Sequence, residues 1–412
     1  MSNTLLKAAY QNKVDVVKEL LAHEAIDPNQ ARTDNGATPL SIAAQKGHVE
    51  VVKALLKHEA IDPNQAMTDK HGSTPLYVAA YQNKVDVVKA LLKHEAIDPN
   101  LARTDDGATP LYISAEEGHF KVVAKLLTHE AIDPNLARTD NGATPLFTAA
   151  QKGRVEVVKA LLAHNADPNQ ATTDDGATPL YIAAQNGHFK VVAKLLGHNA
   201  KPNQATTDHG ATPLYMAVQE GHVDVATALL KHGADPNQAL TIDGATPLYI
   251  SAEEGRVDVA TALLEHGADP NQALTTDGDT PLHIAVSFDQ TDIISILMSH
   301  NADMNQVNKK NISPYNLAFK NINRKIIELF RKIERAPAYR IRKIERTPAY
   351  RKERTPPPSF SPPPSYSYKN TKRVDGLKRR KKTSKKGKKN KSVKKKKHKS
   401  IKKNKSVKKK KN

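Results

Sequence analysis

Residues 34–66 read DNGATPLSIAAQKGHVEVVKALLKHEAIDPNQA, and versions of this stretch recur along most of the chain. The best-kept part is the triplet Thr-Pro-Leu, with its proline at Pro39, Pro75, Pro110, Pro145, Pro179, Pro213, Pro247 and Pro281. The spacing between successive prolines is 36 residues once, 35 residues twice and 34 residues four times. A nearly fixed period in this range indicates stacked copies of one small structural unit.

Each unit carries the signals of two short helices. Thr38 can cap the first helix with its hydroxyl, and Pro39 suits the first helical turn, where its missing N–H costs nothing. Gly47 suits the end of that helix, where a left-handed backbone is easiest for glycine. Each helix has one apolar stripe, which consists of Leu40, Ala43 and Ala44 on the first and Val52, Leu55 and Leu56 on the second. Helices of about ten residues are unstable alone in water, so neighbouring units must bury them.

This unit resembles an ankyrin repeat, whose signature is Asp-x-x-Gly-x-Thr-Pro-Leu-His-x-Ala-Ala, followed by Gly-His, Val-Val, Leu-Leu and Gly-Ala-Asp. The resemblance covers about four fifths of the chain. It implies an all-α solenoid in which each repeat is a β-turn finger followed by two antiparallel helices. Independently, Asp34-Asn35-Gly36 predicts a hairpin-type turn. The near-identity of the units is similar to that of ankyrin arrays of large DNA viruses and intracellular bacteria, which act on host proteins.

We expect ten helix pairs in a solenoid over residues 1–332, with an atypical pair at each end. Thr4-Leu5-Leu6 replaces the triplet in the first pair, and Ser313-Pro314-Tyr315 is a degenerate triplet in the last. Asn311 stands where the other units have glycine, and asparagine tolerates left-handed geometry best after glycine. A Pro-rich linker is expected over residues 333–368. A disordered Lys-rich tail is expected over residues 369–412, because such a segment cannot bury apolar area.

Charge is distributed very unevenly along the chain. Residues 331–412 hold 35 Lys and Arg against 4 Asp and Glu, whereas residues 1–330 hold 28 against 39. An acidic array therefore precedes a very basic tail, although the whole chain has a net charge of +20. No apolar run approaches the roughly 18 residues that cross a bilayer, and the start lacks a signal-peptide pattern. We expect a soluble intracellular protein that is not secreted.

No pattern in the sequence indicates catalysis, a metal or a cofactor. The chain has no cysteine, which excludes a disulfide framework, a thiolate metal site and a cysteine nucleophile. Phosphate-binding loops, nucleophile elbows and His-Glu-x-x-His motifs are missing. The 17 histidines mostly recur with the repeat. Copies in successive layers would lie about 10 Å apart, while zinc needs ligands at about 2 Å, so we expect these histidines to be scaffold residues.

Two residues just after the first-helix alanines vary from unit to unit. Ankyrin arrays, as the resemblance implies, hold partners with their finger tips and the concave face of the first helices, so we expect these pairs to bind a protein. The pairs are Gln45-Lys46, Tyr81-Gln82, Glu116-Glu117, Gln151-Lys152, Gln185-Asn186, Gln219-Glu220 and Glu253-Glu254, with Ser287-Phe288 in the eighth unit. Their glutamates favour a basic partner, and the protein's own tail is one candidate.

An aromatic residue follows the triplet leucine in most units: Tyr77, Tyr112, Phe147, Tyr181, Tyr215 and Tyr249, with His283 in the eighth. We expect half-buried packing of these rings between repeats, and contact with a partner is the alternative. Finger positions also vary, at Arg32, Lys70, Arg103, Arg138, His209, Ile242 and Asp279.

The expected linker contains short repeats and a proline-rich stretch. RKIERAPAYR at 331–340 returns as RKIERTPAYR at 342–351, and TPPPSFSPPPSYSY follows at 355–368. Within it, Pro363, Pro364 and Tyr366 fit the Pro-Pro-x-Tyr ligand of WW domains, which recognise polyproline II structure. A spacer without a ligand is the alternative. Proline-directed kinases recognise residues that precede proline, here Thr347, Thr355 and Ser361.

The expected tail holds 25 basic residues against one acidic residue, and KKNKSVKKKK occurs in it twice. Basic runs of this kind serve as nuclear-import signals or bind polyanions. The candidate residues are Lys378, Arg379, Arg380, Lys381, Lys382, Lys394, Lys395, Lys396 and Lys397. Lysine lacks the planar fork of arginine and no aromatic residue interleaves, so nucleic-acid contacts would not read sequence. A purely solubilising tail and an anionic membrane surface are the alternatives.

Together these features predict a monomeric, non-catalytic adaptor that binds a protein through its ankyrin array and carries a tail for nuclear targeting or nucleic-acid binding. The alternative is a packaging or chromatin factor that acts mainly through the tail. A third hypothesis is self-inhibition, in which the tail lies on the acidic array. A WW-domain protein is a further candidate partner, and no F-box-like segment follows residue 320.

Overall fold

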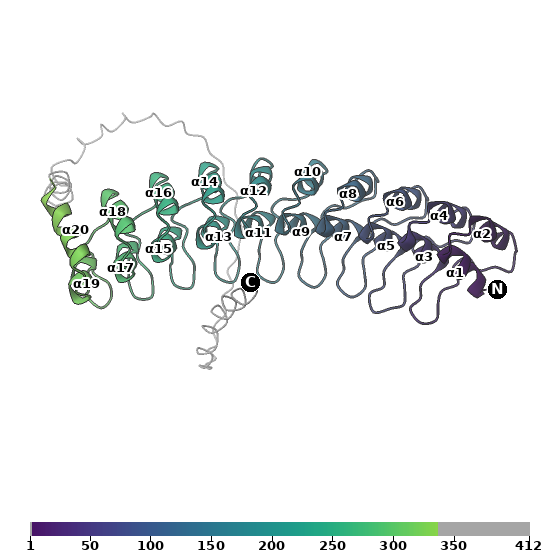
Figure 1. The fold of residues 1–412 in the computed structure, drawn as a ribbon, viewed down its shortest axis with the longest axis horizontal. Coiled ribbons are helices and arrows are strands. Elements are labelled where there is room, and N and C mark those ends of the chain that lie inside the picture. Colours follow the sequence, from purple (N-terminus) through teal and green to yellow (C-terminus); the bar gives the residue numbers. More distant parts are fainter. Residues whose placement is uncertain (1, 337–412) are drawn as a thin grey trace, which may run out of the picture. The chain divides into compact units, whose positions relative to one another are not determined.

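The structure, a computed structural model, describes residues 2–336 (Figure 1). The chain divides into two units, residues 1–347 and residues 348–412, and all the described residues belong to the first unit. Nearly all of the expected linker and the whole expected tail lie outside the described residues. The boundaries at 368 and 369 therefore stay predictions.

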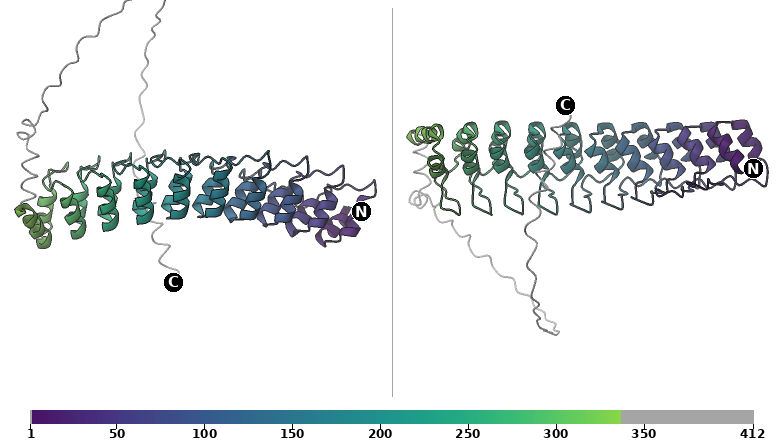
Figure 2. Two further views of the ribbon diagram at one scale, coloured as in Figure 1. Left: turned by 90° about the horizontal axis from the view of Figure 1, so that it is seen from above. Right: turned by 60° about the horizontal axis from the view of Figure 1, so that its bottom comes forward.

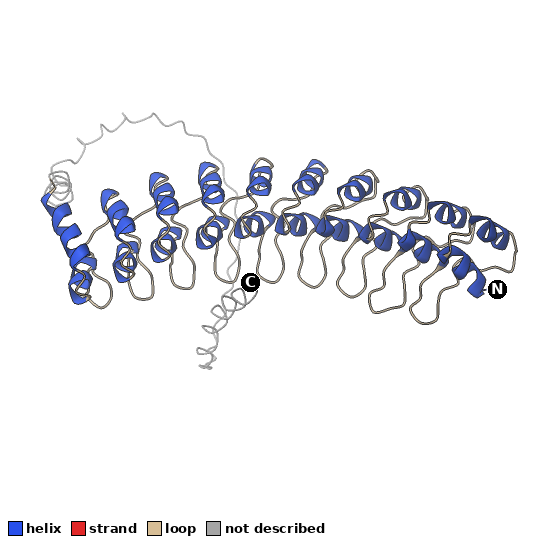
Figure 3. Ribbon diagram, in the orientation of Figure 1, coloured by secondary structure: helices blue, strands red, loops and turns tan. Residues whose placement is uncertain are grey.

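Within residues 2–336 the structure has twenty helices and no strand, which confirms the all-α fold (Figure 3). The first helices of the ten pairs are α1 (Ser2–Tyr10), α3 (Pro39–Lys46), α5 (Pro75–Tyr81), α7 (Pro110–Glu117), α9 (Pro145–Gln151), α11 (Pro179–Gln185), α13 (Pro213–Glu220), α15 (Pro247–Glu253), α17 (Pro281–Ser287) and α19 (Pro314–Lys320). The second helices are α2 (Val14–Leu21), α4 (Val49–Leu55), α6 (Val85–Leu91), α8 (Phe120–Leu126), α10 (Val155–Ala163), α12 (Phe189–Leu196), α14 (Val223–Lys231), α16 (Val257–Glu265), α18 (Thr291–Ser299) and α20 (Arg324–Arg335).

The first and the second helices form two parallel rows. In Figure 1 the described row arches, with the second helices along its outer side and the loops on the other. Figure 2 shows the same loops all projecting to one side of the helices. The finger loops therefore form one continuous edge, next to the row of first helices.

Capping residues set the ends of the first helices as predicted. In α3 the Thr38 hydroxyl oxygen accepts a hydrogen bond from the Ser41 N–H at 3.0 Å, and Pro39 is the first helical residue. A threonine or serine caps every later first helix in the same way. Gly47 ends α3 with φ of 81°, the left-handed conformation expected there. One such cap contributes about 0.5–2 kcal/mol.

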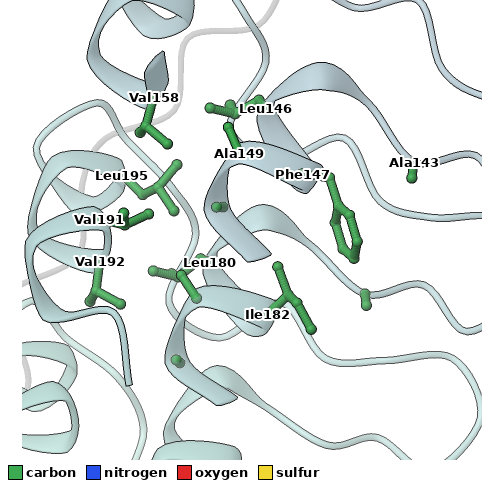
Figure 4. Packing of buried hydrophobic residues seen from close by; sticks show 14 of the residues in the cluster. Ala143, Leu146, Phe147, Ala149, Val158, Leu180, Ile182, Val191, Val192 and Leu195 are labelled. Carbon is green, nitrogen blue, oxygen red and sulfur yellow. The ribbon is translucent and has the colours of Figure 1, made fainter. Parts of the chain in front are cut away.

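One hydrophobic core runs without interruption from Leu5 to Phe330. Each first helix packs against its own second helix and against the first helices of both neighbours, and the second helices do the same. Leu146 of α9, Leu180 of α11 and Leu195 of α12 are at most 1% exposed and lie close together between two layers (Figure 4). Burial of one leucine contributes about 1.5–3 kcal/mol. Since the helices have only 7–12 residues, this shared burial is what holds the layers together.

Successive finger loops are connected by hydrogen bonds from a ladder of asparagine side chains, which the sequence analysis did not predict. The Asn64 side-chain nitrogen donates to the Ala96 carbonyl at 2.6 Å, and its side-chain oxygen accepts from the Asp98 N–H at 3.0 Å. The same pair of bonds to the next repeat is made by Asn29, Asn100, Asn135, Asn169, Asn203, Asn237 and Asn271. Each loop is thereby fixed by the loop before it.

Tight turns at the finger tips bring successive loops into backbone contact. The Arg32 N–H donates to the Ala37 carbonyl at 3.0 Å, which closes the predicted turn, and Gly36 has φ of 69°. The Thr68 N–H of the next finger donates to the Asn35 carbonyl at 3.1 Å. A Cβ on Gly36 would lie only 2.3 Å from the Thr68 nitrogen, so this position requires glycine.

The last helix pair closes the core at the C-terminal end of the array. Ile326 and Phe330 of α20 are fully buried, and this helix ends at Arg335, three residues beyond the expected boundary at 332. Asn311 has φ of 58°, as predicted from its place in the repeat. Ile322 also has a positive φ, of 53°, at the position that Gly47 occupies in the first full unit.

Candidate protein-binding surface

The variable pairs lie at the C-terminal ends of the first helices. Most of their side chains are exposed, whereas Glu116, Gln185 and Glu253 are partly buried. Successive first helices pack against one another from α1 to α19, so the pairs follow each other along one side of the row. The structure thus brings these residues into one line. That they bind a partner stays a prediction.

The backbone under five of the eight pairs is held by a side chain of the following repeat. The His119 ring nitrogen Nε2 hydrogen-bonds the Tyr81 carbonyl at 3.0 Å, and the Arg256 guanidinium donates to the Gln219 carbonyl at 2.9 Å. Equivalent bonds reach the carbonyls of Glu116, Gln151 and Gln185, from Arg154, His188 and His222. Variable side chains are therefore displayed from a fixed backbone, an arrangement typical of recognition surfaces.

These contacts also give the repeated histidines a structural role. In the longer units a histidine after the second helix accepts from the backbone two residues on, as His58 Nδ1 does from the Ala60 N–H at 3.2 Å. In the shorter units it bonds a carbonyl four residues back, as His164 does to Ala160 at 2.9 Å. His283 is fully buried, and its ring bonds the Ile312 carbonyl at 2.9 Å. Among residues 2–336 no three potential ligands come together to hold a metal ion.

The aromatic residues after the triplet leucine are more deeply buried than predicted. Tyr77, Tyr112, Phe147, Tyr215 and Tyr249 are at most 9% exposed, and only Tyr181 is partly exposed. Tyr215 and Tyr249 cluster with Leu240 and Leu274 of the finger loops, and finger arginines lie over Tyr77 and Tyr112. The expected packing of these rings within the array is confirmed, and contact with a partner stays an untested alternative.

Burial also affects the ionisation of the tyrosines in the second half of the array. It raises the pKa of Tyr181 to about 12, with a further contribution from the nearby negative charges of Asp175 and Asp208. The pKa values of Tyr215 and Tyr249 are raised for the same main reason. These hydroxyls stay neutral throughout the physiological range and contribute no charge to the surface.

At two of the variable finger positions, the side chain is bound by other residues of the array. The Arg103 guanidinium lies 5.5 Å from the Tyr77 ring centre and binds the Asp105 carboxylate at 2.5 Å. Arg138 lies in the same way over Tyr112. Arg32, Lys70, His209 and Ile242 are exposed, while Asp279 is partly buried. The two arginines therefore stabilise finger loops in the first half of the array. The exposed finger residues remain available to contact a partner.

Finger loops in the second half of the array are strongly acidic. Loops 164–178, 197–212, 232–246 and 266–280 together hold nine aspartates and a single basic side chain, Lys201, when histidine is counted as neutral. The net charge of the whole array and the charges of the variable pairs do not predict this surface, because neither shows how charge is divided among the loops. A count of charge by loop would have found it. These loops precede the first helices, whose opposite ends carry the exposed Glu220 and Glu254 of the variable pairs.

Other predicted features find no test in the described residues. The WW-ligand residues Pro363, Pro364 and Tyr366 and the basic candidates from Lys378 to Lys397 lie outside them. In the part of the chain that the structure describes, no helix is long and apolar enough to cross a membrane.

Comparison with known proteins identifies the repeat. A family model for ankyrin repeats, taken three copies at a time, matches residues 5–103, 97–172, 167–240, 202–273 and 238–308. A comparison with curated proteins gives no match. Ankyrin repeats support a general role in protein–protein interaction, and proteins built from them are generally non-catalytic adaptors. Because the matched segments extend over more than half of the chain and the described helices pair as such repeats do, the chain belongs to the ankyrin-repeat family.

Proposed function

We propose that this protein is a non-catalytic adaptor whose first-helix side and finger loops bind a basic region of a partner protein. The line of variable, solvent-facing pairs on a backbone fixed by the next repeat carries this proposal. The helix ends below the pairs do not need to be ordered on binding, which lowers the entropic cost of association.

The charge of the same side favours a basic partner. The acidic loops of the second half precede the first helices α13 and α15, and Glu220 and Glu254 stand at the C-terminal ends of these helices. Complementary charge raises the rate of encounter and suppresses binding of acidic competitors. Lys46 and Lys152 make the first half less acidic, so we expect the strongest contacts in repeats six to eight.

Alanine substitutions along the line of pairs test this proposal. A partner recovered with the full chain would be purified and titrated against a variant with Asn186, Gln219, Glu220 and Glu254 changed to alanine, all exposed in repeats six to eight. A matched control changes four exposed second-helix residues, Lys121, Lys159, Lys190 and Asp224. We expect the pair variant to weaken binding at least about tenfold and the control to leave it unchanged. Equal affinity of both variants would contradict the proposal.

The Lys-rich segment 369–412 supports a second role, in nuclear targeting or sequence-independent binding of nucleic acid. Its net charge of +24 would neutralise phosphates. If about ten phosphates are neutralised, the logarithm of the binding constant falls with the logarithm of salt concentration at a slope near −9. Import receptors, the acidic array and a WW-domain protein on Pro363, Pro364 and Tyr366 are further candidate partners of the C-terminal region.

Deletion of 369–412 separates the adaptor from a packaging or chromatin factor. The adaptor keeps its affinity for the purified partner protein and loses only its location or its nucleic-acid binding. A packaging factor loses its whole function with the tail. If the tail instead occupies the acidic array, its deletion raises the affinity for a basic partner.

A further inference from the structure

A groove crosses three second helices near the N-terminal end of the array, on the row opposite to the first helices. It has a volume of about 1080 Å3 and is lined by residues of α2, α4 and α6 and of the turns that follow them. These are the first three upper helices at the purple end of Figure 1. The groove is separate from the surface in the proposed function above.

Lysines dominate the rim of this groove. Its charged lining consists of five lysines against Glu50 and Asp86. Lys18 and Lys53 are paired with acidic residues on their own helices, at 3.8 Å and 2.7 Å. The other three, Lys57, Lys89 and Lys93, form no ion pair within residues 2–336. With five lysines against two carboxylates, the rim has an excess of positive charge.

The floor between the lysines is apolar. It is formed by Leu21, Val49, Ala54, Leu56 and Ala90, all of them only partly buried at the edge of the core. No Phe, Tyr, Trp or Arg lines the groove, and its only rings are the imidazoles of His58 and His94. Each imidazole accepts a hydrogen bond from the backbone of its own turn, at the Ala60 and Ala96 N–H groups. The groove therefore lacks the Phe, Tyr, Trp and Arg side chains on which nucleic-acid bases usually stack. A side chain of a peptide can instead bury apolar area on such a floor.

This combination is local rather than a feature of every repeat. Lys53 and Lys57 belong to the second repeat. The equivalent residues of the third repeat, in α6 and the turn after it, are also lysines, Lys89 and Lys93. In the fourth repeat the same positions hold Ala124 and Thr128, and in the eighth Thr261 and Glu265. Among the ten repeats of the described array, only the second and third have lysine at both positions.

We propose that this groove binds an acidic peptide segment with apolar side chains, from a second partner protein. Carboxylates of the peptide would pair with Lys57, Lys89 and Lys93, while its apolar side chains would cover Ala54 and Ala90. The protein's own tail has the wrong sign of charge for this groove. With the first-helix side proposed to bind a basic region, the array would hold two partners of opposite charge on its two sides.

A dye placed in the groove reports binding there without a contribution from the basic tail. The chain has no cysteine, so an A22C variant of the full chain can be labelled at one site. Ala22 lines the groove, and Ala163 occupies the equivalent position in the fifth repeat, outside it. The probe is a synthetic peptide of Glu, Leu and Ala whose apolar residues recur with the period of an α-helix. It is titrated into both labelled proteins. We expect a saturable signal from the dye at residue 22 and none from the dye at residue 163.

Charge reversal then identifies the residues involved. K57E, K89E and K93E together should weaken the signal at residue 22 at least about tenfold, because three attractive contacts become repulsive. The control reverses three exposed lysines outside the groove, with K159E, K190E and K194E, and should change it less than about twofold. Equal effects of the two triple variants would overturn the proposal.

Other probes distinguish the chemistry of the occupant. A peptide of glutamate alone should bind more weakly, since it leaves the floor uncovered. If the glutamate peptide binds equally well, the assignment to an acidic peptide with apolar side chains is wrong. The assignment is also wrong if duplex DNA or phosphatidylserine vesicles bind more tightly and K57E, K89E and K93E weaken that binding to the same extent. A signal that depends on protein concentration alone would also overturn it, since such a signal would indicate a second copy of the chain. Alanine variants of the first-helix pairs should leave the signal unchanged, so the two proposals can fail separately.

Discussion

Ile322 has a backbone φ of 53°, a left-handed conformation that is strained for a β-branched side chain. It follows α19, where the equivalent residues of other repeats are Gly47, Asn83 and Gly118, all with positive φ. Its side chain is 78% exposed, so it contributes little burial in return. The strain exists because the chain must turn here to bring α20 back against α19.

Asparagine in place of Ile322 should relieve this strain. We expect I322N to raise the free energy of unfolding of the last helix pair by about 1 kcal/mol, since a left-handed conformation costs L-residues about 1–2 kcal/mol and asparagine much less. Hydrogen exchange of α20 in the full chain measures the change. I322V keeps the branched side chain and should leave exchange as it is. Faster exchange in I322N would show that the turn is not strained.

Three buried tyrosines make the stability of the array depend on pH in the alkaline range. Folding raises the pKa of Tyr181 from 10 to about 12, and burial also raises those of Tyr215 and Tyr249. The unfolded chain therefore loses tyrosine protons at a lower pH than the folded chain. Its free energy falls relative to the folded state, so stability declines as pH rises from about 10 towards 12.

Phenylalanine at these three positions should remove that part of the decline. The variant Y181F, Y215F and Y249F should lose less stability than the wild type between pH 9 and pH 11, roughly, as measured by urea unfolding at each pH. Tyr81 is 47% exposed, so Y81F serves as the control and should follow the wild type. Parallel curves for the triple variant and the wild type would contradict the assigned cause.

At the scale of elements, local sequence signals were sufficient for the helices but not for the contacts between loops. Thr38, Pro39 and Gly47 act within one turn of backbone, so their pattern predicts where α3 begins and ends. The bonds of Asn64 reach residues more than thirty positions away and depend on how the layers stack. The depth of burial of Tyr77 likewise depends on the loop that covers it. The groove at α2, α4 and α6 was missed because three repeats together form it.

The asparagine ladder predicts a stability difference between equivalent residues. In N100A the bonds to the Ala131 carbonyl, at 2.6 Å, and from the Asp133 N–H, at 3.0 Å, are lost. Each bond contributes about 0.5–1.5 kcal/mol, so we expect N100A to cost about 1–3 kcal/mol in urea unfolding. Asn305 occupies the same place in the last such loop, and its side chain makes no bond to a following repeat within residues 2–336. N305A should therefore cost less than about 0.5 kcal/mol. Similar losses would show that the ladder does not couple repeats.

At the scale of the whole array, a core without branches means that each layer depends only on its neighbours. The cluster from Leu5 to Phe330 is continuous, and the main helix–helix contacts of the described array lie within one repeat or between adjacent repeats. A chain of this kind behaves as a sum of repeat stabilities and interfaces. The consequence of a core substitution should therefore depend on where in the row it lies.

Two leucines with the same burial test this dependence on position. Leu161 in α10 and Leu5 in α1 are both 0% exposed. Each change to alanine should cost about 2–5 kcal/mol locally, because it removes buried methyl groups and leaves a cavity. L5A should increase hydrogen exchange only in α1 and α2, since one neighbour supports them. Leu161 lies between the N-terminal and C-terminal halves of the array. L161A should therefore uncouple the two halves and divide urea unfolding into two steps. Uniformly faster exchange from α1 to α20 in L5A would instead mean that the array unfolds as one unit.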